Sequence, residues 1–306
     1  MQVIRGKTPH YTFDPNVNPV CRVKPSELFV IETEINVGDA IRTEKDRLGP
    51  GSIHWPYVNP LTGPIYVETV KPGDAIAIHI DQIEIIPPVY CALVPGWSAF
   101  SPWFGREDFD YQTRIVELRN GQIHWNERLQ FPARPMVGTI GVAPEIGAPH
   151  SVDNGRHGGN MDVQETEPGN TLVLISAVEG GLLYLGDAQI HQGDGELACT
   201  SIEARARVHL SIERRSAPKS MSWPRLEGSD FLMTIVPAHP LEEAFKLAFQ
   251  ELVLWVEEEY GADRTEAYML LGQTVEARAT QICNPKPTYV CKLKKQFLKA
   301  FGNRTA

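Results

Sequence analysis

The chain has 306 residues, of which 42% are hydrophobic and 22% are charged, and its formal net charge is -9. This composition is typical of a globular protein that buries a substantial core. The charge argues against a nucleic acid or an anionic membrane as partner, because there is no basic surplus to neutralise phosphates. No segment approaches the roughly 20 apolar residues of a membrane span.

The N-terminal sequence and the cysteines indicate a cytoplasmic protein. The first residues, MQVIRGKTPHYTF, lack the apolar core of a secretory signal. The five cysteines are odd in number and include no C-x-x-C pair, so we expect reduced thiols.

The first 230 residues predict short strands separated by turns that contain proline or glycine. Residues 75–86 and 196–215 alternate between apolar and polar side chains, which is the pattern of a half-buried strand. Many short strands of this kind favour an antiparallel β-sandwich or barrel-like core. The predicted fold class is therefore α+β, dominated by strands, with a C-terminal α/β portion.

The last third changes to helical periodicity. Residues 240–260 place apolar side chains on one helix face, and Gly261 suits the C-terminal cap. Asp263 then begins a capping box that opens a second helix through Gln273, followed by a strand at 275–283 and a short basic helix at 292–301. We expect residues 1–229 to form a β-rich core that carries the active site. Residues 230–306 would be an α/β portion packed on that core, and the sequence leaves its independence open.

Two glycine-bracketed polar clusters are the most informative feature of the chain. Between them lie two apolar runs, 171–178 and 182–185, which predict a hairpin that brings the clusters together. Residues 158–200 contain no lysine or arginine, so the clusters do not resemble salt-bridged surface. The clusters consist of Asn160 and Asp162, and of Asp187, Gln189, His191, Asp194 and Glu196.

These residue types suit a divalent cation or a proton-transfer pair. In an extended segment Asp187, Gln189 and His191 point to one face, because side chains alternate along a strand. Glu196 would then serve as general base to a metal-bound water, and His157 adjoins the first cluster. The opposing interpretation is that the Asn and Asp residues only form turns beside glycine, and composition alone leaves both open.

Other catalytic signatures are missing from the sequence. There is no G-x-S-x-G, H-E-x-x-H, P-loop or Rossmann fingerprint, and Gly138-Thr-Ile-Gly141 is too short for nucleotide binding. Cys199 falls on a predicted strand without a neighbouring base, so we expect a buried structural thiol there.

The strings GGNMD and YLGDAQIHQGDGE, with Glu203 downstream, resemble the signature of the acetamidase/formamidase family. Residues 59–67 and 134–144 resemble further parts of that family in the same order, and the resemblance extends from about residue 28 to about residue 300. It implies a metal-dependent hydrolase that cleaves short aliphatic amides to carboxylate and ammonia. It also implies a homo-oligomer with a β-rich fold.

The two clusters and the resemblance together lead to expected roles for individual residues. Zinc is the expected cation, with calcium or magnesium as alternatives, and Gln189 stands where the family pattern commonly has histidine. We expect Asp162, Asp187 and His191 to hold the cation, with His157 as a further ligand. We expect Glu196 to transfer the proton, and Asn160 or Gln192 to position the amide or stabilise the oxyanion.

Two alternatives remain at this stage. The chain could bind a small polar ligand without turnover, or it could hydrolyse a larger linear amide. In the second case four aromatic residues could widen the pocket, namely Trp97, Trp103, Phe104 and Trp125.

Overall fold

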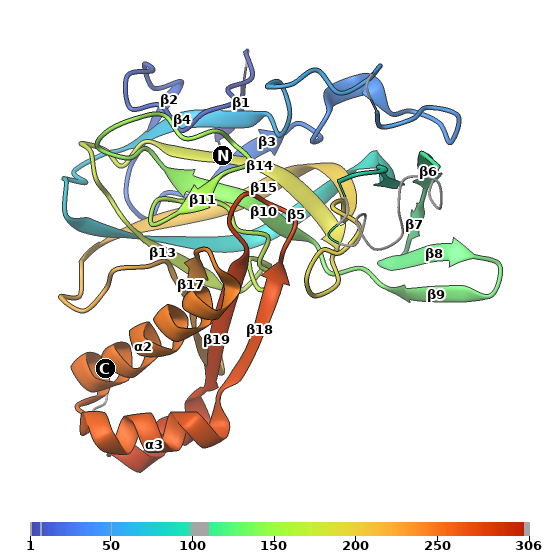
Figure 1. Ribbon diagram of the computed structural model, residues 1–306. Coiled ribbons are helices and arrows are strands. Elements are labelled where there is room, and N and C mark those ends of the chain that lie inside the picture. The colour runs from blue at the N-terminus through green and yellow to red at the C-terminus, as the bar shows by residue number, and fades with distance from the viewer. Residues whose placement is uncertain (1, 7, 50, 98, 100–109, 303–306) are drawn as a thin grey trace.

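A computed structural model describes residues 2–6, 8–49, 51–97, 99 and 110–302, so Trp103 and Phe104 lie outside the described residues. Within this part of the chain, sixteen strands form one curled, mostly antiparallel sheet and three more form a small second sheet (Figure 1). Both α-helices lie near the C-terminus. The predicted strand-dominated fold with C-terminal helices is confirmed. Neither helix in the described residues is long and apolar enough to span a membrane.

The strands that precede the first α-helix make up most of both sheets. The first nine are β1 (Gln2–Arg5), β2 (Cys21–Val23), β3 (Phe29–Thr33), β4 (Leu61–Val67), β5 (Asp74–Leu93), β6 (Gln112–Ile115), β7 (Glu117–Arg119), β8 (Gln122–Asn126) and β9 (Leu129–Pro132). The next eight are β10 (Met136–Val142), β11 (Asn154–Gly155), β12 (Gly158–Asn160), β13 (Thr171–Ile175), β14 (Leu183–His191), β15 (Ile202–Ser216), β16 (Arg225–Glu227) and β17 (Phe231–Pro237). A short 3-10 helix, η1 (Gly38–Ala40), lies between β3 and β4.

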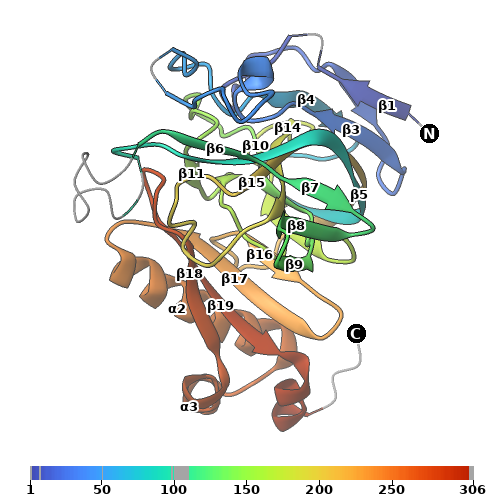
Figure 2. The ribbon, with the colours of Figure 1, turned by 90° about the vertical axis from the view of Figure 1, so that its right-hand side faces the viewer.

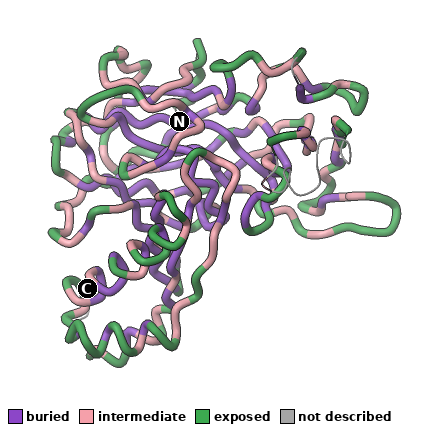
Figure 3. The backbone as a smooth tube through the Cα atoms, viewed as in Figure 1, coloured by how far each residue is buried: buried purple, intermediate pink, exposed green. Residues whose placement is uncertain are grey.

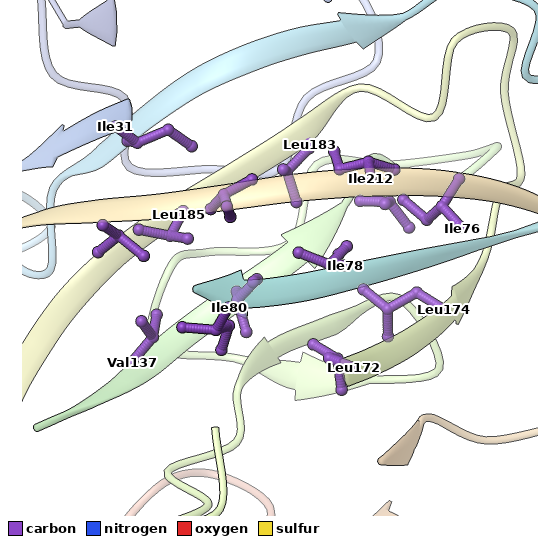
Figure 4. Close-up of a cluster of buried hydrophobic side chains, with 14 of the residues drawn as sticks. Ile31, Ile76, Ile78, Ile80, Val137, Leu172, Leu174, Leu183, Leu185 and Ile212 are labelled. Carbon is purple, nitrogen blue, oxygen red and sulfur yellow. The ribbon is translucent and has the colours of Figure 1, made fainter. Parts of the chain in front are cut away.

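The long strands β5 and β15 pair antiparallel and form the centre of the main sheet. Figure 4 shows their isoleucines beside leucine and valine side chains from β10, β13 and β14. The alternation predicted for residues 75–86 is only partly right, because Ala75 to Ile78 are all buried. A second apolar cluster covers the alanines of this strand, so both of its faces are buried there.

The predicted hairpin between the two polar clusters is wrong. β13 pairs with β5 and β16, whereas β14 pairs with β10, β15 and β4. The apolar runs are real strands, but each finds its partners elsewhere in the sheet. Sequence pattern identifies a strand and does not identify its neighbours.

The C-terminal portion contains α2 (Leu241–Tyr260), α3 (Arg264–Thr274), β18 (Glu276–Gln281), β19 (Thr288–Lys294) and the 3-10 helix η2 (Lys295–Phe301). Gly261 ends α2 in the left-handed conformation and Asp263 accepts two backbone hydrogen bonds at the start of α3, as predicted. The predicted basic helix begins later than expected, because Lys292 belongs to β19.

This portion continues the main sheet instead of forming a separate one. Strands β16, β17, β19 and β18 follow β13 in an unbroken order, and α2 packs on β17 and β19 (Figure 2). A boundary at residues 229/230 would divide the pair β16–β17. Figure 3 shows buried residues concentrated in the central strands, while α3 is largely exposed.

A buried ion pair fastens β16 to α2. The Nε and Nη2 atoms of Arg225 donate to Glu251 Oε1 at 3.1 and 3.0 Å, and the two side chains are 2% and 3% exposed. The guanidinium also lies 4.7 Å from the ring centroid of Trp255. Removing one of the two side chains would leave the other charge buried and unpaired, which lowers the stability of the fold.

We predict that Arg225→Ala lowers the free energy of unfolding by about 3–5 kcal/mol, because Glu251 would stay buried without its partner. Urea denaturation measures this change. Arg264→Ala is the matched control, since its pair with Glu257 is 66% and 33% exposed; we expect a loss of no more than about 1 kcal/mol there. Equal losses in the two variants would contradict the prediction.

Candidate active site

The two polar clusters meet because their strands share a neighbour. β12 and β14 both pair with β10, and Thr139 on β10 lies opposite Asn160 on one side and Gly186 on the other. The Thr139 hydroxyl donates to Asn160 Oδ1 and to Asp187 Oδ2, the latter at 3.4 Å. The predicted convergence is therefore present, although β10 produces it and the expected hairpin does not.

Four carboxylates are buried together at this point: Asp162, Asp187, Glu196 and Glu203, which are 0%, 4%, 8% and 2% exposed. The Gln189 Nε2 atom lies 3.2 Å from Asp162 Oδ1 and 3.5 Å from Asp187 Oδ2. Within the described residues none of the four carboxylates forms an ion pair with lysine, arginine or histidine. Buried carboxylates are normally paired, so this group is typical of a functional site.

Local backbone geometry turns these side chains inward. Asp162, Asp187 and Glu196 have φ angles of 50°, 55° and 45°, in the left-handed region that non-glycine residues rarely adopt. Such conformations cluster at functional sites, where the surrounding structure holds them.

Gly138 on β10 leaves the space that two of the carboxylates occupy. A Cβ atom there would lie 2.5 Å from Asp162 Oδ1 and 2.6 Å from Asp187 Oδ2. Any side chain would therefore push the two carboxylates apart. The short glycine pattern at 138–141 thus serves close packing at the site.

Burial raises the pKa values of all four carboxyl groups. It raises the pKa of Asp187 to about 6, against hydrogen bonds from Glu203, Thr139 and Gln189 that lower it. Burial, followed by the charges of Asp187 and Cys199, raises the pKa of Glu196 to about 8. Burial and neighbouring carboxylates also raise the pKa values of Asp162 and Glu203. Near neutral pH this group holds protons as well as negative charge, which is the condition for acid–base chemistry.

Glu196 receives hydrogen bonds from both sides. Ser201 Oγ donates to its Oε1 at 3.1 Å and Cys283 Sγ donates to its Oε2 at 3.3 Å. Cys199 lies in the turn after Glu196 and lines the same cavity, so the expected position on a strand is wrong. A hydrogen bond from Cys283 lowers the pKa of the Cys199 thiol.

Two asparagines lie beside the carboxylates. Asn160 Oδ1 accepts a hydrogen bond from the Thr139 hydroxyl, and Asn160 Nδ2 has no hydrogen-bond partner among the described residues. Asn284 Nδ2 donates to Asp162 Oδ2 at 2.7 Å. Asn284 follows β18 and lies far from both clusters in the sequence, where no local pattern distinguishes it from a loop residue.

The site opens into a cavity of about 350 Å³. Its polar wall contains Asn160, Asp187, Glu196, Cys199, Glu203, Cys283 and Asn284, and its apolar wall contains Val37, Leu48, Trp55, Val58 and Trp97. Trp125, another predicted pocket residue, instead lies on β8, where Arg114 stacks on its ring at 4.5 Å.

Asp162 is buried behind the cavity wall with the other carboxylates, and three further predicted site residues lie outside this group and do not line the cavity. His157 lines a different cavity and packs on Phe13 at 5.0 Å between ring centroids. His191 lines a third cavity, because a β-bulge between Gln189 and His191 interrupts the alternation that predicted a shared face. Gln192 lines that third cavity too, and its Nε2 donates to the backbone oxygens of Asp162 and Thr280 at 2.9 and 2.8 Å.

The side chains at the site determine which cation could bind there. No group of three His, Cys, Asp or Glu side chains within the described residues is arranged to hold a metal ion. Both histidines of the predicted ligand set, His157 and His191, line other cavities, so the four predicted ligands do not come together. Calcium and magnesium prefer oxygen ligands. The site offers oxygens of this kind, from the carboxylates that have no basic partner among the described residues and from Gln189 Oε1, which is buried and has no hydrogen-bond partner.

Comparison with known proteins decides the family. Residues 3–152 and 145–224 match the model of the Acetamidase/Formamidase family. The chain belongs to the acetamidase/formamidase family. Membership makes it a hydrolase of amide C–N bonds. No curated protein matches the chain.

Solved structures of similar proteins agree over nearly the whole chain. An acetamidase from Bacillus halodurans is 27% identical with a TM-score of 0.91, covering 98% of this chain and 100% of its own. An acetamidase from Yersinia enterocolitica is 31% identical with a TM-score of 0.91, covering 97% and 93%. A predicted acetamidase/formamidase from Thermoanaerobacter tengcongensis is 27% identical with a TM-score of 0.90, covering 99% of each chain.

Proposed function

We propose that the cavity hydrolyses the C–N bond of a linear primary amide to a carboxylic acid and ammonia. Family membership gives the reaction class. The observation that carries the assignment is Glu196, a buried carboxyl group with a pKa of about 8. It lines the same cavity as Asn160, whose Nδ2 atom has no hydrogen-bond partner among the described residues. A group with a pKa near the working pH can both accept and donate a proton.

In this reaction Glu196 transfers the proton and Asn160 stabilises the negative charge on oxygen. The oxygen of a water molecule attacks the carbonyl carbon while Glu196 accepts the proton that the water loses. Asn160 Nδ2 donates a hydrogen bond to the carbonyl oxygen, which becomes negative in the tetrahedral intermediate. Glu196 then passes the proton to the leaving nitrogen as the C–N bond breaks, and the products are carboxylic acid and ammonia.

We further propose that calcium or magnesium binds at Asp162, Asp187 and the Gln189 side-chain oxygen. The four buried carboxyl groups have no basic partner in the part of the chain that the structure describes, so a cation would neutralise their negative charge. The amide orientation of Gln189 follows from its hydrogen bonds, and a rotated amide would present oxygen to the ion. When bound, such an ion would polarise the substrate carbonyl and lower the pKa of a bound water.

We also propose a cytoplasmic homo-oligomer. The five cysteines are free, which suits a reducing compartment. Tyr268 and Met269 on α3 are 62% and 66% exposed, and Phe245 on α2 is 39% exposed. Exposed apolar side chains of this kind suit contact with a second copy of the chain.

Replacement of Glu196 tests the reaction directly. We expect Glu196→Gln to lower kcat for ammonia release by about 10²–10⁴-fold, because the shuttle is lost while the side-chain volume is kept. Cys199→Ser is the comparison, since a thiol from the same turn would be essential only in a covalent mechanism. Retained activity in Glu196→Gln, or a comparable loss in Cys199→Ser, would refute the assignment of Glu196.

The pH profile tests the environment of Glu196. Activity that requires ionised Glu196 rises with pH through its pKa, which is about 8. The Cys283 thiol lowers that pKa by hydrogen bonding to the charged form, so Cys283→Ala should move the rise in kcat/KM to higher pH. Cys283→Ser, which keeps a donor, and Cys291→Ala, which lies in the core of the C-terminal portion, should leave the profile in place. A shift to lower pH in Cys283→Ala would contradict the prediction.

Cation binding can be measured without activity. After treatment with a chelator, we expect calcium or magnesium to raise the melting temperature of the protein, and Asp162→Asn or Asp187→Asn to abolish the rise. Asp194→Asn is a control from the same sequence motif, because its side chain is 63% exposed and lies outside the site. Stabilisation by zinc alone would contradict the choice of ion, and no response to any of the three ions would refute the site.

A further inference from the structure

The cavity is much larger than the smallest amides require. Its volume is about 350 Å³, within the range of roughly 300–1,000 Å³ that holds ligands of drug size. A water molecule occupies about 30 Å³ in the liquid, and acetamide is only a few times larger. Acetamide would therefore leave most of the cavity to solvent.

The unfilled part of the cavity has an apolar wall from a separate part of the chain. Leu48, Trp55 and Val58 belong to the segment between β3 and β4, and Trp97 follows β5. The three lining carboxylates come from β14, the turn after β14 and β15, while Asn160 ends β12 and Asn284 follows β18. Two further lining asparagines, Asn36 and Asn59, belong to the same segment as Trp55. One substrate can thus contact a polar wall with its amide and an apolar wall with its substituent.

Trp55 is fixed in position although its ring is exposed. It is 62% exposed and stacks on His150, with 4.8 Å between ring centroids and 28° between ring planes. His150 is in turn held by a hydrogen bond to the backbone oxygen of Pro56 at 2.6 Å. An indole held open to solvent at a cavity wall gains contacts and loses exposed area when an apolar group binds. Its geometry is set before binding, so little entropy is lost.

The charges of the lining select against an acidic substituent. Among the described residues that line the cavity, Asp187, Glu196 and Glu203 are acidic and none is lysine, arginine or histidine. A carboxylate on the substrate would meet acidic side chains and no basic side chain among these lining residues. The fitting substituent is therefore apolar and uncharged.

We propose that the substrate is a primary amide carrying an uncharged aryl or bulky alkyl group, which binds against Trp55, Leu48 and Val58. This proposal rests on the amide hydrolysis proposed above. It makes Trp55 a residue of the substituent pocket, distinct from the polar wall where the bond is broken.

Ammonia release from acetamide, phenylacetamide and succinamate tests the substrate class. We expect kcat/KM for phenylacetamide to exceed that for acetamide by at least about tenfold, as apolar groups in hydrophobic pockets commonly provide. Succinamate, which carries a carboxylate, should be the poorest of the three.

Variants of one loop then locate the pocket. Trp55→Ala should reduce the ratio of kcat/KM for phenylacetamide over acetamide by about tenfold, and Trp55→Phe should retain most of it. Tyr57→Ala is the matched control, because Tyr57 is also 62% exposed and does not line the cavity. Melting curves of each variant verify folding. In Glu196→Gln, phenylacetamide should raise the melting temperature more than acetamide does, which tests binding without turnover.

The outcomes separate this inference from the proposed reaction. Hydrolysis of acetamide with an equal or lower kcat/KM for phenylacetamide would overturn the aryl or alkyl substituent and leave amide hydrolysis intact. An unchanged ratio in Trp55→Ala, or succinamate as the best substrate, would also overturn it. Release of ammonia from none of the three would refute the proposed reaction and this inference together.

Discussion

Burial of several carboxylates without a basic counter-ion is the constraint on which the site depends. Burying a negative charge in an apolar sheet costs free energy. Hydrogen-bond donors, retained protons or a bound cation reduce that cost. The structure supplies donors from Gln189, Asn284, Thr139 and Ser201, all of them neutral. The raised pKa values of the carboxyl groups follow from the cost that remains.

The sequence predicted that the two polar clusters would meet, and they do, but for a different reason from the one expected. Asn160, Asp162 and Asp187 are recognisable because glycines bracket them and residues 158–200 contain no lysine or arginine. Strand partners were not recognisable, because pairing is decided by contacts between distant segments. The prediction that His191 shares a face with Asp187 and Gln189 is wrong for a local reason. It assumes a regular strand, and the β-bulge after Gln189 interrupts the alternation of side chains.

Other residues of the site could not be recognised from the sequence. Cys283 and Asn284 stand singly between two strands, and only the packed structure brings them to Glu196 and Asp162. Glu203 was visible in the motif, yet its burial beside Asp187 depends on the pairing of β14 with β15. The helices of the C-terminal portion were more predictable, since Gly261 and Asp263 act within one helical turn of the residues they cap.

The loop between β18 and β19 places Cys283 and Asn284 against the buried carboxylates, which come from residues 162–203. The strands on either side of that loop are the last of the main sheet. The candidate site is therefore complete only once the final quarter of the chain has been synthesised and has joined the sheet. A ribosome-bound chain that lacks this quarter has neither Asn284 to hydrogen-bond Asp162 nor Cys283 to hydrogen-bond Glu196.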